Sequence, residues 1–232
     1  MKYLSMILLG LAVTSAAAND TLNIDVDVSS DAAACTPALS NGGKADFGNR
    51  SASSLSGKAF TQLGTRELVL TITCESSTAV AIAARDTRAT SVVVGADKNG
   101  GVGPLMSVNG PHYVGYATQL FGLGFTDEKK PIGSYAVEIN AAGVTAQDGN
   151  QTVSVDIAGS VRKNGPWSKV EQPSLWKSES YFYTFVKKGT VTPQPISSAS
   201  VPLQISASVA SQLSSSQSIT LDGEAVISII YL

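Results

Sequence analysis

The sequence predicts an all-β protein, either a sandwich or a barrel. Three observations lead to this prediction. Apolar and polar residues alternate over many short segments, no stretch of a dozen residues follows a helical period, and clusters of Gly, Pro, Asn and Asp stand between the segments. Many short strands separated by turn residues are typical of sandwiches and barrels.

Residues 1–18 have the composition of a secretory signal peptide. Lys2 supplies a positive charge, residues 4–13 form an apolar core, and residues 15–18 are small. The apolar run is too short to span about 30 Å of hydrocarbon, and no later run reaches the roughly 18 apolar residues of a membrane helix. We therefore expect an exported protein of the periplasm and cell surface with no membrane span after signal removal.

Residues 19–30 form the first predicted strand and an N-terminal extension. Their alternation gives one polar face and one apolar face. The residues of the apolar face are Leu22, Ile24, Val26 and Val28. The remainder, residues 31–232, is long enough for one large β domain, although this length also permits a body with a small second lobe.

Residues 67–84 predict a β-hairpin. Alternate positions from Leu68 to Cys74 are apolar, residues 75–77 supply a turn, and apolar positions resume at Val80. Later segments repeat this strand pattern. They are residues 91–94, 113–121, 135–139, 153–157, 181–185, 201–207 and 221–231.

Cys35 and Cys74 are the two cysteines of the chain. In the oxidising compartment that a signal peptide implies, two cysteines favour one disulfide. A closed loop of about 40 residues would stabilise the fold by about 4 kcal/mol in the chain-entropy account. A metal site would need more ligands than these two residues and the lone His112, so we expect no metal and no cofactor.

The charge pattern excludes electrostatic binding of nucleic acid or of anionic lipid. The chain has a formal net charge of −2, with 15% charged and 43% hydrophobic residues, and its Lys and Arg residues are scattered. This composition predicts a polar but weakly charged surface.

No motif for catalysis stands out, and we do not expect an enzyme. His112 follows an Asn-Gly-Pro turn and is predicted to be an exposed loop residue, since no G-x-S-x-G segment offers it a nucleophile. Paired carboxylates could still hydrolyse glycosides if two of them faced each other. The candidates are Asp86, Asp127, Glu128 and Asp156.

Trp167 and Trp176 bracket a loop rich in Pro, Lys and Ser, which is a possible ligand loop. Two interpretations of these tryptophans remain open. The tryptophans could be platforms for a sugar, or they could be partly buried core residues.

The two ends of the chain resemble chaperone–usher pilins. An alternating segment precedes Cys35, the second cysteine ends an early strand, and residues 221–232 alternate with tyrosine next to last. The chain is also similar to a domain-of-unknown-function family typified by the GltF periplasmic protein. The segments that carry this second resemblance are 35–43, 46–48, 70–74, 81–82, 85–88 and 221–223.

The pilin resemblance implies an immunoglobulin-like sandwich that lacks its last strand and assembles by donor-strand complementation, with a role in cell adhesion. A periplasmic pilus chaperone, an outer-membrane usher and other fimbrial subunits or a second copy would be the partners. The apolar face of residues 19–30 would supply the donor side chains. The strand recognised by the chaperone, which lines the acceptor groove, would comprise Leu221, Gly223, Ala225, Ile227, Ile229 and Tyr231.

One departure from pilins favours an alternative. A pilin donor strand usually carries a glycine at one apolar position, and residues 19–30 contain none. The segment could instead fold back and complete its own domain. That alternative gives a self-complemented periplasmic or tip protein that recognises a glycan or a protein.

Overall fold

The structure is a computed structural model that describes residues 21–29, 35–48, 54–94, 103–108, 110–211, 213 and 219–232. The predicted signal peptide, residues 1–18, lies outside these ranges. The predicted all-β class is confirmed: strands form two sheets packed face to face, and helical structure in the described residues is limited to short 3-10 turns. No helix in this part of the chain is long and apolar enough to cross a membrane.

The first sheet, sheet A, contains both terminal strands. Its central strand β5 is buried at six of its seven positions, as expected for a strand that is covered on both faces. In spatial order the strands are β13 (Ser168–Lys169), β12 (Val155–Ser160), β14 (Phe182–Lys187), β5 (Val80–Asp86), β16 (Glu224–Tyr231), β1 (Thr21–Ser29) and β3 (Lys44–Asp46).

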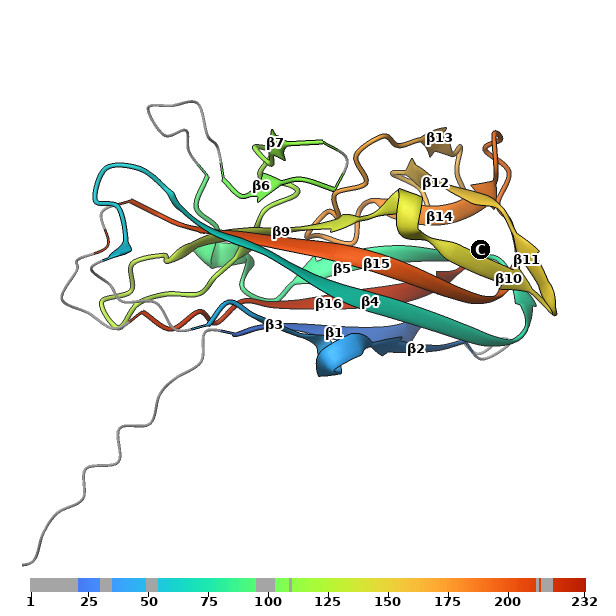
Figure 1. Cartoon of the computed structure of the whole chain (residues 1–232), viewed down its shortest axis with the longest axis horizontal. Coiled ribbons are helices and arrows are strands. Elements are labelled where there is room, and N and C mark those ends of the chain that lie inside the picture. Colours follow the sequence, from blue (N-terminus) through green and yellow to red (C-terminus); the bar gives the residue numbers. More distant parts are fainter. Residues whose placement is uncertain are drawn as a thin grey trace, which may run out of the picture.

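The second sheet, sheet B, is built on two long antiparallel strands that run along the molecule (Figure 1). Its order is β11 (Gln151–Val153), β10 (Thr145–Asp148), β15 (Ile196–Val209), β4 (Thr61–Thr78) and β2 (Cys35–Leu39). A further strand, β9 (Gly133–Ile139), also pairs with β15 and carries β8 (Phe121–Gly122). The 3-10 turns are η1 (Ser40–Gly43), η3 (Ala89–Ser91) and η4 (Ala141–Gly143).

The predicted hairpin over residues 67–84 is wrong. The two strands of this segment, β4 and β5, lie in different sheets: β4 pairs with β15 and β2, whereas β5 pairs with β14 and β16. Residues 75–77, expected to form a turn, continue β4. Alternation assigns a buried face to each strand but does not specify its partner, so the chain can cross between the sheets at Ala79 without breaking the pattern.

Buried apolar side chains of both sheets form one continuous core. Its largest members include Tyr135, Tyr183, Phe121 and Phe185. A small hairpin of β6 (Leu105–Met106) and β7 (His112–Tyr113) adds a second apolar cluster around Met106, Leu120 and Ala136. Because Ala136 lies on β9, this cluster helps to bury all seven residues of that strand.

Candidate functional site

The two ends of the chain meet in a seam between β1 and β16. These strands are parallel, in a register that runs from Asn23 opposite Glu224 to Ser29 opposite Ile230. The Asn23 N–H also donates a hydrogen bond of 2.9 Å to the Gly223 carbonyl. The predicted donor segment therefore lies beside the predicted acceptor segment of its own chain, which was one of the two arrangements that the sequence left open.

The apolar face of β1 enters the core. Leu22 is 0% exposed and Ile24 is 2% exposed, while Val26 is half-buried and the side chain of Val28 lies outside the described part. The facing side of the C-terminal segment is buried as well, at Leu221, Gly223, Ala225, Ile227, Ile229 and Tyr231. The structure thus brings the described members of both predicted sets into one apolar layer.

Leu22 packs directly over Gly223. A Cβ atom at Gly223 would lie 2.6 Å from Leu22 Cδ2 and 2.8 Å from Tyr135 Cε1, which is closer than atoms can approach without displacement. The predicted donor segment has no glycine, but the predicted acceptor segment has one at Gly223, which makes space for Leu22. Alternation alone does not indicate this complementarity, because it does not specify which residues meet across strands.

A disulfide and a tyrosine anchor the strand that follows the seam. The predicted disulfide is confirmed: Cys35 and Cys74 face each other across β2 and β4 and are bonded. The Cys35 N–H donates a buried hydrogen bond of 2.7 Å to the hydroxyl of Tyr231. The tyrosine next to last in the chain therefore ties the end of β16 to the start of β2 in the other sheet.

A polar network holds the start of β16. Arg88 Nε lies 3.0 Å from Asp222 Oδ2, and a second guanidinium nitrogen lies 3.4 Å from Glu224 Oε2. The Thr87 hydroxyl donates to Glu224 Oε2 at 2.5 Å. The contacts join the Arg-Asp-Thr-Arg segment at 85–88 to the Leu-Asp-Gly segment at 221–223, so two motifs far apart in the sequence form one structural unit.

Asp86 belongs to the same unit. Its carboxylate accepts hydrogen bonds from the backbone N–H groups of Gly122 (2.9 Å) and Arg88 (2.8 Å). Burial raises the pKa of the Asp86 carboxyl above its usual value, and these two hydrogen bonds act in the opposite direction. This carboxylate, considered above for glycoside hydrolysis, thus fixes the turn that leads out of β5.

His112 is not the exposed loop residue that its turn sequence predicted. Its side chain is 18% exposed, and Nε2 lies 3.0 Å from Oε2 of Glu138, a carboxylate on β9 that is 0% exposed. The Ser174 hydroxyl donates to the same carboxylate oxygen at 2.9 Å. The serine thus contacts the glutamate and not the histidine, so this trio lacks the nucleophile–base contact of a hydrolase.

Trp176 and Trp167 do not form a common platform. Trp176 stacks on Tyr181 with a centroid distance of 4.7 Å and packs against the main core. Trp167 is half-buried and follows Pro166 after β12. Trp176 is therefore a partly buried core residue, which is one of the two interpretations given above. Within the described ranges, no group of three or more His, Cys, Asp or Glu side chains could hold a metal ion.

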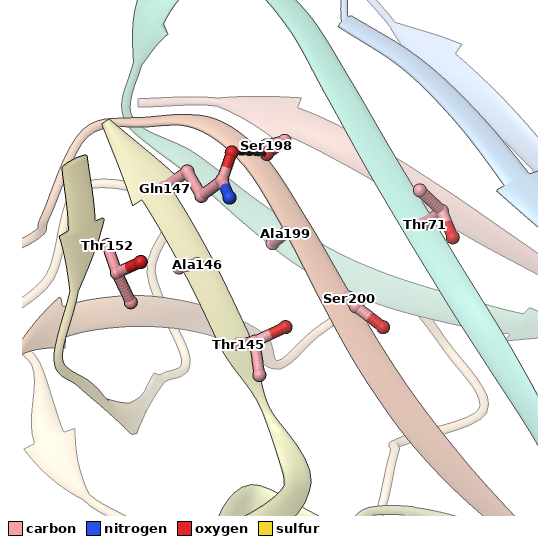
Figure 2. Close-up of a pocket in the computed structure, with 8 residues that line it drawn as sticks. All are labelled: Thr71, Thr145, Ala146, Gln147, Thr152, Ser198, Ala199 and Ser200. Carbon is pink, nitrogen blue, oxygen red and sulfur yellow. Dashed lines mark hydrogen bonds between the residues drawn. The ribbon is translucent and has the colours of Figure 1, made fainter. Parts of the chain in front are cut away.

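A shallow hollow of about 320 Å³ lies on sheet B, across β10, β15 and neighbouring strands. Figure 2 shows its lining, which consists of Thr71, Thr145, Ala146, Gln147, Thr152, Ser198, Ala199 and Ser200. Every side chain in it is small or neutral, and none is aromatic. It offers hydroxyl groups but no charge that would orient a ligand.

The fold and the seam define a disulfide-clamped β-sandwich protein whose N-terminal strand pairs with its own C-terminal strand. Residues 24–136 match the family described as "Protein of unknown function (DUF1120)". The chain is 48% identical over 222 residues to "Uncharacterized protein YhcF" of Escherichia coli (strain K12), covering 94% of this chain and 93% of that protein. It is 28% identical over 251 residues to "Protein GltF" of the same strain, covering 97% and 94%. The chain belongs to the family of proteins of unknown function named above.

Proposed function

We propose that this protein is an exported structural subunit of a chaperone–usher fimbria, with a role in cell adhesion, that assembles by donor-strand complementation. The observation that carries the proposal is the seam, in which β1 pairs with β16 over seven positions and inserts Leu22 and Ile24 into the core. In this proposal β1 first completes its own sandwich and later completes that of a neighbour.

Removal of β1 would open an acceptor groove. It would expose the side chains of Ala225, Ile227 and other core residues and leave the edge of β16 without its backbone partner. Fully burying one large apolar side chain contributes about 1.5–3 kcal/mol, so Leu22 and Ile24 give an incoming strand a substantial share of its affinity. An added strand then gains affinity from backbone hydrogen bonds and specificity from alternate side chains.

The proposed partners follow from this groove. A periplasmic pilus chaperone would place a strand where β1 lies, an outer-membrane usher would receive the complex, and β1 of another subunit or a second copy would replace the chaperone strand. The exchange substitutes one apolar alternating strand for another, so its net free-energy change is small.

The test is to produce the exported protein with and without a pilus chaperone, as the full chain and with residues 19–30 deleted. The full chain should be recovered as a folded monomer alone and should form polymers with the chaperone and usher. The deletion variant should be recovered only bound to the chaperone and should not polymerise. Polymers formed equally well by the deletion variant would contradict the proposal.

A matched pair of substitutions tests the apolar face of β1 against its polar face. Leu22→Asp places a charge in the core and should block polymers, whereas Asp25→Asn changes an exposed residue of the same strand and should leave assembly unchanged. Equal effects of both substitutions would argue against complementation through the apolar face.

A further inference from the structure

A second hollow, of about 420 Å³, lies where β12, the following turn and β13 meet Tyr181. Its volume falls in the range of about 300–1,000 Å³ that is usual for small-molecule sites. It is lined by Gly159, Ser160, Val161, Arg162, Pro166, Ser168 and Tyr181. Neither tryptophan of the predicted ligand loop is in this lining.

Three polar side chains in this lining are available to a ligand. They are the guanidinium of Arg162 and the hydroxyls of Ser168 and Tyr181, and within the described part of the chain none has a hydrogen-bond or ion-pair partner. A small number of polar side chains in the lining of a concave surface is typical of a binding site.

Tyr181 is held in place by its neighbours. Its ring stacks on Trp176 at 24° between the ring planes and lies against the backbone of Gly159. A Cβ atom at Gly159 would come within 2.4 Å of Tyr181 Cε1, so the absence of a side chain there makes room for the ring. The Tyr181 hydroxyl is a hydrogen-bond donor at neutral pH, as a tyrosine with its ordinary pKa is, and burial raises this pKa further.

The turn beside this hollow carries an excess of positive charge. Lys163 follows Arg162 in the turn, Lys169 follows Ser168 on β13, and both lysines are exposed. In the described ranges none of these three cations makes an ion pair, and Glu171 is the one acidic residue between positions 161 and 175. This distinguishes the hollow from the neutral one on sheet B.

We propose that this hollow binds a carboxylated sugar, with Arg162 pairing with the carboxylate and with Tyr181 and Ser168 hydrogen-bonding to the sugar hydroxyls. The planar guanidinium matches a carboxylate through two parallel hydrogen bonds, and the aromatic side chain and hydroxyl supply the amphipathic surface that a sugar ring requires. The site is independent of the β1–β16 seam and does not rest on strand exchange.

The test is titration calorimetry on the folded monomer with sialyllactose, a hyaluronan tetrasaccharide and neutral lactose. At least one carboxylated probe should bind at millimolar concentration or better, with affinity that falls as salt is added, and lactose should bind at least tenfold more weakly. Binding of one carboxylated probe but not the other identifies the sugar as sialate or uronate. No binding of either probe, or equal binding of lactose, would overturn the proposal.

Substitutions locate the site. Arg162→Gln should reduce affinity roughly tenfold or more, because a charge-assisted hydrogen bond is lost, and Tyr181→Phe should reduce it a few-fold with the ring stack retained. Lys58→Gln, a change of the same charge in the exposed turn before β4, should leave affinity unchanged. Equal losses for Arg162→Gln and Lys58→Gln would mean a general charge effect and would reject the site. Because the monomer is used, a failure here leaves the proposed assembly untouched, and the reverse also holds.

Discussion

The first two strands of the chain, β1 and β2, lie along the same side of the sandwich but are held in different ways (Figure 1). The edge strand β2 is antiparallel to β4 over five residue pairs and is bonded to it through Cys35 and Cys74. By contrast, β1 is parallel to β16 and is held by backbone hydrogen bonds and the burial of its apolar face. The disulfide thus fixes the strand next to the seam and leaves β1 free of any cross-link within the described residues.

Most of β1 is paired along one edge only, which agrees with its weaker attachment. From Ile24 onward β1 pairs with β16 alone among the described strands, since β3 reaches only to Asn23. The exposed residues along this stretch include Asp25 and Asp27. Charged side chains on an edge strand oppose unwanted strand pairing. They would therefore limit association to the partner that the acceptor groove selects.

The largest expected loss of stability comes from removing the disulfide. The double substitution Cys35→Ser/Cys74→Ser should lower the free energy of unfolding by about 4 kcal/mol, because the unfolded chain regains the freedom that the cross-link removes. Urea denaturation of the variant beside the oxidised and reduced wild-type protein measures the loss. A change below about 1 kcal/mol would mean that β2 does not need its cross-link.

The next largest loss of stability should come from shortening Leu22, the main apolar side chain of the seam. Leu22→Ala should cost about 3 kcal/mol, since it deletes a wholly buried leucine and leaves a cavity. Asp25→Ala, at an exposed position of the same strand, should change stability by less than about 0.5 kcal/mol. Thermal unfolding of both variants gives the comparison, and similar small shifts in both would indicate that β1 is not packed in the core in solution.

A smaller effect tests the contact between Leu22 and Gly223. Gly223→Ala should cost about 2 kcal/mol, because its Cβ collides with Leu22 and Tyr135. In the double variant Leu22→Ala/Gly223→Ala the added methyl group meets a shortened side chain, so the two losses should not add. Strict additivity in the denaturation free energies would contradict the contact.

Loss of one hydrogen bond should have a comparable or lesser effect. Tyr231→Phe keeps the ring but leaves the buried N–H of Cys35 without its acceptor, at a cost of about 1–2 kcal/mol. Tyr113→Phe, at an exposed tyrosine, is the matched control. The same unfolding free energy for both variants would remove Tyr231 from the link between the sheets.

The smallest effect is a pH dependence from Asp86. Because burial raises its pKa above the reference value of 3.8, the folded state holds the proton more tightly than the unfolded state does. Its contribution is therefore fully present below pH 3.8 and is lost as the pH rises through the higher folded-state pKa. The stability of the wild-type protein relative to Asp86→Asn should increase on acidification, and a difference that falls instead would contradict this assignment.

The sequence was sufficient for the features that depend on local pattern. Alternation located the apolar faces of β1, β4 and β16, and the two cysteines gave the disulfide. Pairing could not be derived in the same way, because alternation defines a face and not a neighbour. For this reason the pattern of β4 and β5 also fits a hairpin, and it carries no information on the parallel direction of the seam.

Contacts between side chains that meet across the fold could not be predicted from local pattern either. His112 lies beside Glu138, a residue of another strand, and its turn sequence contains no sign of this pairing. The hollow at Tyr181 joins residues of separate segments, and neither predicted tryptophan lines it. The basic turn that begins with Arg162 and Lys163 was a signal in the sequence that could have indicated it.

Cysteine cross-linking tests the central claim most directly. Asp25 and Val226 are paired in the seam, so Asp25→Cys/Val226→Cys should form a disulfide within one chain when the monomer is oxidised. Asp25→Cys/Ile230→Cys, with the second cysteine four positions out of register, is the control. In polymers mixed from the two single variants, the same bond should join neighbouring subunits. Cross-linking of the paired positions no faster than the control, in both monomer and polymer, would contradict the account that β1 is the strand that completes this sandwich.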